Sequence, residues 1–340
     1  MIILFVPIGI ILNLSEKIDN LKENKAPLDE ILYFYFNFVI YFANLLFPIL
    51  LFLSVIWFTS KLANNSEIIA FLSSGVSFTR FLRPYLIGAT VVFFIALSFS
   101  MYIYPNSSED YNTFFYKYLK KSKSIRDTKN IYRQINDNEY IYASSYSPKT
   151  QKAYNFTLEH FEGQRMTYKI SANQIKFNKD SLNYTLKNYT KRTIKSKKDI
   201  LFKKKSFDTI LPFELEELTP TIYAAETKNY FELLDFIEDE KRRGSPYIKL
   251  YMIDLYKRLS VPVSTFILTI IAVAVSSFKK RGGMGVNLAL GIVIAFSYVF
   301  LDKVFATVAE KSSFSPFLAV WLSNFIFGAI AILLLKKAKR

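Results

Sequence analysis

Long apolar runs with almost no charged side chains constrain this chain more than any other feature of its sequence. A bilayer core about 30 Å thick requires roughly 20 apolar residues of helix. Five of the six runs reach that length, whereas the first is too short to span and lacks the basic start of a signal peptide. Hydrophobic residues make up 51% of the chain, which is more than a soluble protein of this size carries, so part of that surface is expected to face lipid. The runs lie at residues 1–14, 32–60, 85–104, 259–278, 286–309 and 316–335.

Basic residues are concentrated in the short segments that join these runs on one side. Segments 61–84 and 279–285 and the tail 336–340 carry ten basic residues against a single acidic one, Glu67. This bias is typical of cytoplasmic loops, so we expect residues 105–258 on the opposite side of the membrane. The formal net charge of +16 therefore does not predict a nucleic-acid partner, because the basic runs of that middle segment would be solvated outside the cytosol.

The middle of the chain changes from helical to strand periodicity. From about Tyr132 to Ile194 apolar residues alternate with polar ones, turn signals separate the runs, and residues 206–213 are expected to add a last strand. Short strands at this spacing favour an antiparallel sandwich or jelly roll. The predicted fold is an α-helical membrane protein with six transmembrane helices, three on each side of an inserted antiparallel β-jelly-roll domain. The predicted parts are residues 1–104, 105–258 and 259–340.

The residue types that support catalysis are scarce. The chain has no cysteine, and its only histidine, His160, lies within an alternating strand pattern, so neither a catalytic nor a metal site is predicted. The sequence also lacks the Gly-x-x-x-x-Gly-Lys-Ser/Thr loop that cradles nucleotide phosphates. We therefore expect a non-catalytic chain that binds neither ATP nor Mg²⁺ itself.

The segment between the second and third runs, residues 64–84, carries the clearest functional pattern. Glu67 would follow a polar cap at the N-terminus of a short helix, which Gly75 would close in a left-handed conformation. Ser77 would cap a second helix that carries Arg80. The elbow so formed would present apolar side chains either to another protein or to the lipid interface. These side chains are Ile68, Ile69, Phe71 and Leu72.

Several short motifs occur in the same order as in one known family. They are Glu67-Ile-Ile-Ala70 and Gly75-Val-Ser77 followed by Arg80 and Pro84, then Asn130–Gln134, the Lys279–Gly283 turn and Ala319–Asn324. Together they resemble the lipopolysaccharide export permeases, the LptF/LptG (YjgP/YjgQ) family, over essentially the whole chain. Relatives carry a basic lead-in before a full first span, so we expect additional chain before residue 1.

The resemblance implies a permease subunit of an ABC transporter in the inner membrane. Such a subunit extracts lipopolysaccharide and passes it to a periplasmic β-jelly-roll bridge toward the outer membrane. The implied partners are an LptB-type ATPase dimer, which would bind ATP and Mg²⁺, a sibling LptF/LptG permease, an LptC-type periplasmic protein and lipopolysaccharide. The implied ATPase-coupling residues are Glu67, Ile68, Ile69, Phe71, Leu72, Gly75, Ser77 and Arg80.

Basic residues near the external helix ends are candidates for the anionic lipid head group on position alone, although each also fits a snorkelling or solvated lysine. A membrane-anchored envelope scaffold or sensor, whose β-domain binds a ligand without transport, is the alternative function, and a lipid-modifying enzyme is a third. The sequence shows neither a cytoplasmic output domain nor an external cluster of carboxylates or histidines, which favours transport. The candidate lysines are Lys17, Lys22, Lys25 and Lys303.

Overall fold

The chain forms two compact units. The computed structural model describes residues 2–120, 128–178, 181–195, 198–215, 218–279 and 283–338, with side chains from residue 6 onward. The helical unit comprises Met1–Lys121, Ala225–Leu233 and Lys249–Arg340. The sheet unit comprises Ser122–Ala224 and Leu234–Ile248. Each unit has its own buried core.

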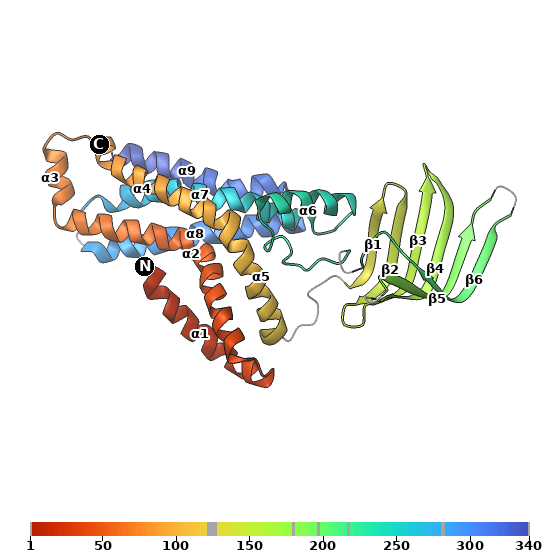
Figure 1. Cartoon of the computed structure of the whole chain (residues 1–340). Helices are drawn as coiled ribbons and strands as arrows, with labels where there is room; N and C mark the ends of the chain where they lie inside the picture. The colour runs from red at the N-terminus through yellow and green to blue at the C-terminus, as the bar shows by residue number, and fades with distance from the viewer. Residues whose placement is uncertain are drawn as a thin grey trace. The chain divides into compact units, whose positions relative to one another are not determined.

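Long helices dominate the helical unit (Figure 1). Within the described residues, five helices are long and apolar enough to cross a membrane, namely 28–64, 78–119, 248–276, 283–311 and 316–338. The multi-span class is thus confirmed, but the count of six is not. The elements are α1 (Ile2–Glu23), α2 (Leu28–Asn64), α3 (Glu67–Ser73), α4 (Phe78–Ser98), the π-helix η1 (Phe99–Ile103), α5 (Tyr104–Phe114), the π-helix η2 (Phe115–Leu119), α6 (Tyr230–Arg242), α7 (Ile248–Ser276), α8 (Gly283–Lys311) and α9 (Pro316–Ala338).

Helix α1 extends further than the apolar run predicts. The polar segment after Leu14, which lies outside that run, forms the last turns of the helix. The buried Leu21 side chain packs in a cluster with Phe34 and Phe114, and Asn24 Nδ2 donates to the Tyr118 carbonyl at 2.8 Å. Packing on η2 therefore keeps helical a segment whose composition alone favours a loop.

Helix also continues beyond the apolar run that ends at Tyr104. Pro105 lies in the first turn of α5, and helix continues to Leu119. Proline is tolerated where its missing N–H is not required, and the π-helical turn η1 changes the hydrogen-bond register just before it.

Helix α7 lies at the centre of the helical unit. In its most apolar stretch 61% of the residues are buried, compared with 22% in α2 and in α8. The buried side of α7 includes Ser264, Thr265, Ala272 and Ala274, small residues that let neighbouring backbones approach closely. A core cluster joins it to α2, α8 and α9 through Phe52, Ile56, Leu268, Ile271, Ala272, Ala295, Tyr298, Phe327 and Ala331.

The sheet unit contains one six-stranded antiparallel sheet with strands in chain order (Figure 1). Cross-strand pairs place apolar side chains on one face, as where Leu158 lies opposite both Ile141 and Ile170. After the last strand, Phe213, Leu215 and Leu218 pack on that same core. The strands are β1 (Lys129–Asn136), β2 (Glu139–Ser147), β3 (Lys152–Glu162), β4 (Arg165–Asn178), β5 (Asn183–Thr193) and β6 (Ile200–Thr209).

The antiparallel sheet is as predicted, but a jelly roll is not confirmed. A jelly roll needs Greek-key connections between two sheets, whereas each described strand here pairs with its sequence neighbours. Alternation and turn spacing predict strands and hairpins but carry no information on longer connections. The last strand is also displaced from its predicted range: it ends at Thr209, and residues 211–213 cover the sheet core instead.

Candidate functional site

The elbow between α2 and α4 has the local structure that its sequence predicts. Helix α3 begins at Glu67, and Gly75 adopts a left-handed conformation with a φ of 86°. The Ser77 hydroxyl accepts a hydrogen bond from the Arg80 backbone N–H at 3.4 Å and caps α4. The cap of α3 differs from expectation, because Ser66 is left-handed and makes no side-chain cap. Asn65 Nδ2 instead donates to Glu67 Oε1 at 2.9 Å.

The apolar residues of α3 divide between two faces. Ile68 is only 2% exposed and packs with Phe78, Phe81 and Leu82 of α4, so it is not presented outward as we expected. Leu72 is half-buried against the same cluster. Ile69 is 50% exposed and Phe71 is 40% exposed. A helical period of 3.6 residues places neighbouring positions on different faces, which separates an anchoring side from an exposed side.

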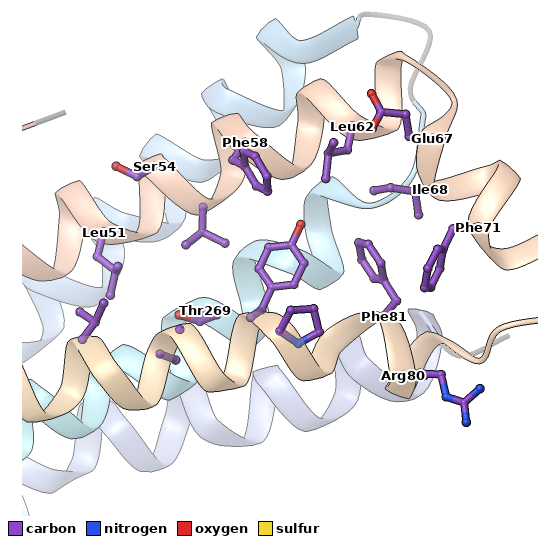
Figure 2. Close-up of a pocket in the computed structure, with 16 residues that line it drawn as sticks. Leu51, Ser54, Phe58, Leu62, Glu67, Ile68, Phe71, Arg80, Phe81 and Thr269 are labelled. Atoms are coloured by element: carbon purple, nitrogen blue, oxygen red, sulfur yellow. The ribbon is translucent and has the colours of Figure 1, made fainter.

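An apolar cavity of about 680 Å³ lies between α2 and α4 beneath this elbow (Figure 2). Leu51 and Phe58 of α2 line one wall, Phe81 lies on the other, and Thr269 of α7 contributes to the lining. Tyr85 lines the cavity too, and its hydroxyl accepts a hydrogen bond from Thr59 at 3.1 Å, which joins the two spans. The elbow therefore connects α2 and α4 at a place where the cavity separates the two helices.

The elbow can act as a mechanical connection between spans. Ile68 shares its buried cluster with Ala63 of α2, Phe81 of α4 and Val273 of α7. The Lys279 Nζ, which follows the end of α7, also donates to the Ser66 hydroxyl at 3.4 Å. The same cluster includes Ala338 of α9. A force applied to the exposed side of α3 would therefore reach four long helices through this packed cluster, because close-packed side chains transmit displacement.

A second site, which sequence reasoning missed, is a polar cavity of about 170 Å³ enclosed by helices. Lys257 of α7 and Asp302 of α8 form an ion pair there at 2.8 Å. The same cavity is lined by Glu226 and Arg258, and burial raises the pKa of the Glu226 carboxyl. The two residues of this ion pair lie 45 positions apart in the chain. The only signal in the sequence was charged residues at the edge of an apolar run.

The structure separates the four candidate lysines. Lys303 lines the polar cavity, whereas Lys17 pairs with Glu16 on α1, and Lys22 and Lys25 are exposed. Across the described part of the chain, no three potential metal ligands of the His, Cys, Asp and Glu types lie together. His160 stacks on Tyr168, and its Nδ1 lies 2.7 Å from the Thr167 hydroxyl.

Comparison with known proteins adds one positive finding. No curated protein matches the chain. The family described as "Lipopolysaccharide export system permease LptF/LptG" matches residues 1–337, which include the elbow, the sheet and every candidate span. A match that covers nearly every residue shows membership, and the chain therefore belongs to the LptF/LptG family of lipopolysaccharide export system permeases.

Proposed function

We propose that this chain is the permease subunit of an ABC transporter that extracts lipopolysaccharide from the inner membrane. In this proposal the elbow lies in the cytoplasm, as the basic segments 61–84 and 279–285 favour. The sheet unit lies in the periplasm, within the inserted segment 105–258. An LptB-type ATPase dimer supplies the energy by binding ATP and Mg²⁺, and a sibling LptF/LptG permease completes the membrane part.

The observation that carries this proposal is the two-sided elbow. Glu67, Ile69 and Phe71 are exposed, whereas Ile68 on the opposite side is buried in a cluster with residues of α2, α4, α7 and α9. An exposed carboxylate beside apolar side chains suits a groove that offers an Arg and an apolar wall. Movement of the bound ATPase would then displace α3, and the buried Ile68 would carry that displacement into α2, α4 and α7.

The sheet unit supports the transfer step of the proposal. Strand β6 pairs only with β5 within the described sheet, and most of its residues are exposed, among them Leu201 and Phe202. An open edge is suited to strand addition by another sheet. We propose that the sheet forms part of a jelly-roll-type bridge with an LptC-type periplasmic protein, along which the lipid passes.

The head-group contact in this proposal is Lys303 rather than the α1 lysines. Lys303 is exposed and also lines the polar cavity between α7 and α8, so its ammonium group is available to an anion. Lys17, Lys22 and Lys25 stay candidates for a more peripheral contact, since they lie in or just after the polar end of α1.

The decisive experiment is co-purification of the ATPase with Glu67→Lys. Charge reversal should abolish recovery of the ATPase, because a carboxylate that accepts an Arg becomes a repelling ammonium group. Glu310→Lys is the matched control, since Glu310 is also exposed and helical but lies at the far end of α8. Equal recovery with both variants would refute the coupling role.

Topology can be tested independently, because residues 1–340 contain no cysteine. Ser74→Cys, on the exposed end of the elbow, should react with an impermeant maleimide only after the cytoplasmic side is opened. Labelling from the periplasm would overturn the orientation. In the assembled complex, ATP hydrolysis should respond to added lipopolysaccharide.

A further inference from the structure

A short segment between the two parts of the sheet unit belongs to the helical unit. Ala225–Leu233 lies within the helical unit, whereas the residues on either side of it, up to Ala224 and from Leu234, lie in the sheet unit. The segment ends in a capping box at the start of α6: Asn229 Oδ1 accepts from the Glu232 N–H, and Glu232 Oε2 accepts from the Asn229 N–H. Residues 225–228, which precede this capping box, are held by hydrogen bonds to side chains of α5 and α7.

Arg258 of α7 forms one side of that anchor. Its side chain is 4% exposed, and its Nη2 donates to the Ala225 carbonyl at 3.1 Å and also to the Lys228 carbonyl. Two backbone carbonyls of one short segment are thus held by one guanidinium group. The Arg258 Nη1 has no hydrogen-bond partner among the described residues, and Arg258 also lines the polar cavity.

Glu226 forms the other side of the anchor. It lies between Ala225 and Lys228 in the sequence. Its Oε2 accepts from the Ser108 hydroxyl at 3.2 Å and from Asn112 Nδ2 at 3.3 Å, both on α5. Asn112 is itself fixed by a bond to the Ser108 carbonyl at 2.9 Å. The segment is therefore bound on one side to α5 and on the other to α7.

The charged groups around Glu226 come from α7 and α8. They are the acids Asp254 and Asp302 and the bases Lys257, Arg258 and Lys303, whereas α2 and α5 contribute the neutral titratable side chains Tyr41, Tyr104 and Tyr111. Desolvation opposes the charged form of the buried Glu226 carboxyl and raises its pKa above the ordinary value of 4.5.

We propose that Arg258 and Glu226 form a latch that fixes the segment Ala225–Lys228 between α7 and α5. Arg258 and Glu226 are positioning residues, because they act on the backbone that leads to and from the sheet unit. Because the segment is hydrogen-bonded to both helices, a movement of α5 or of α7 would also move the segment, whichever lipid the protein carries.

The first test is hydrogen exchange of the full-length protein in lipid nanodiscs, read by mass spectrometry over peptides that contain residues 225–228. Arg258→Met removes both donors while retaining a long side chain, and it should accelerate exchange there by about tenfold. Lys257→Met is the matched control, because it removes an adjacent charge of α7 whose partner is Asp302 rather than the segment. Exchange that is unchanged in Arg258→Met, or raised equally by Lys257→Met, would overturn the latch.

The second test starts from Glu226 and survives a failure of Arg258→Met to fold. Glu226→Ala removes the acceptor of the hydrogen bonds from Ser108 and Asn112, so it should accelerate exchange over residues 225–228. Glu226→Gln, a neutral side chain that keeps an acceptor and fits the same space, is the matched control and should keep exchange there slow. Exchange in Glu226→Ala that equals that of the unsubstituted protein would refute the assignment to Glu226.

Discussion

Gly291 of α8 packs directly on Ile56 of α2. A Cβ atom at position 291 would lie 2.4 Å from Ile56 Cδ1, closer than real Cβ contacts allow. Ile56 is fully buried within the core that joins α2, α7, α8 and α9, so it has little room to move. The contact between α2 and α8 therefore depends on the absence of a side chain at position 291.

The first prediction follows from that contact. Gly291→Ala should destabilise the helical unit by about 1–3 kcal/mol, the usual cost of overpacking a core. Gly88→Ala is the matched control, because Gly88 also lies inside a spanning helix and a Cβ there meets nothing within 4 Å. Thermal unfolding in detergent should show a lower midpoint for Gly291→Ala alone. Equal midpoints would mean that α8 shifts to accommodate the methyl group.

The second prediction separates the two sides of the elbow. Ile68→Ala should lower stability by about 2–4 kcal/mol, because it removes a fully buried side chain and leaves a cavity. Ile69→Ala should leave the unfolding midpoint unchanged and weaken ATPase recovery, since Ile69 is half-exposed and outside the buried cluster. If Ile69→Ala lowered the midpoint and preserved ATPase binding, the assignment of the two faces would be reversed.

The local signals in the sequence were sufficient for the elbow. A carboxylate at the start of a short helix, Gly75 after its end and Ser77 before the next helix each determine backbone geometry within a few residues. Which of Ile68 and Ile69 would be buried was not predicted, because it depends on where Phe78 and Phe81 of α4 lie. The local sequence pattern was therefore enough to predict the short helix α3, whereas tertiary packing determined which of its faces is buried.

The polar cavity shows the opposite case. Glu226, Lys257 and Asp302 are far apart in the chain, and nothing in their immediate neighbours indicates that they line one cavity. Helix extends past the apolar runs that end at Leu14 and Tyr104 for a related reason, since packing of α1 on η2 and the π-helical turn before α5 override local composition. Sequence alone gave the class of fold and the number of long apolar helices to within one.

The third prediction concerns hydrogen bonds between spans. The Tyr298 hydroxyl donates to Asn324 Oδ1 at 2.9 Å, and Asn324 Nδ2 donates to the Ser260 carbonyl at 3.0 Å, so one amide joins α8, α9 and α7. Tyr298→Phe should cost about 0.6–1.7 kcal/mol, the range for such bonds in membranes. Asn324→Leu should cost more, because it also removes the bond to Ser260. The comparison is made by unfolding midpoints, and a larger effect of Tyr298→Phe would contradict the arrangement.

The last prediction concerns the segment that covers the sheet core. The buried Tyr184 hydroxyl donates to the Phe213 carbonyl at 2.8 Å and accepts from the Leu215 N–H at 3.2 Å. Tyr184→Phe keeps the ring but leaves two buried backbone groups without that partner, at a cost of about 1–3 kcal/mol. Hydrogen exchange at residues 211–215 of the full chain should rise accordingly. Tyr154→Phe, which alters an exposed hydroxyl on β3, is the control and should leave that segment protected. If both variants exchange alike, side-chain packing rather than the Tyr184 hydroxyl holds the segment on the sheet.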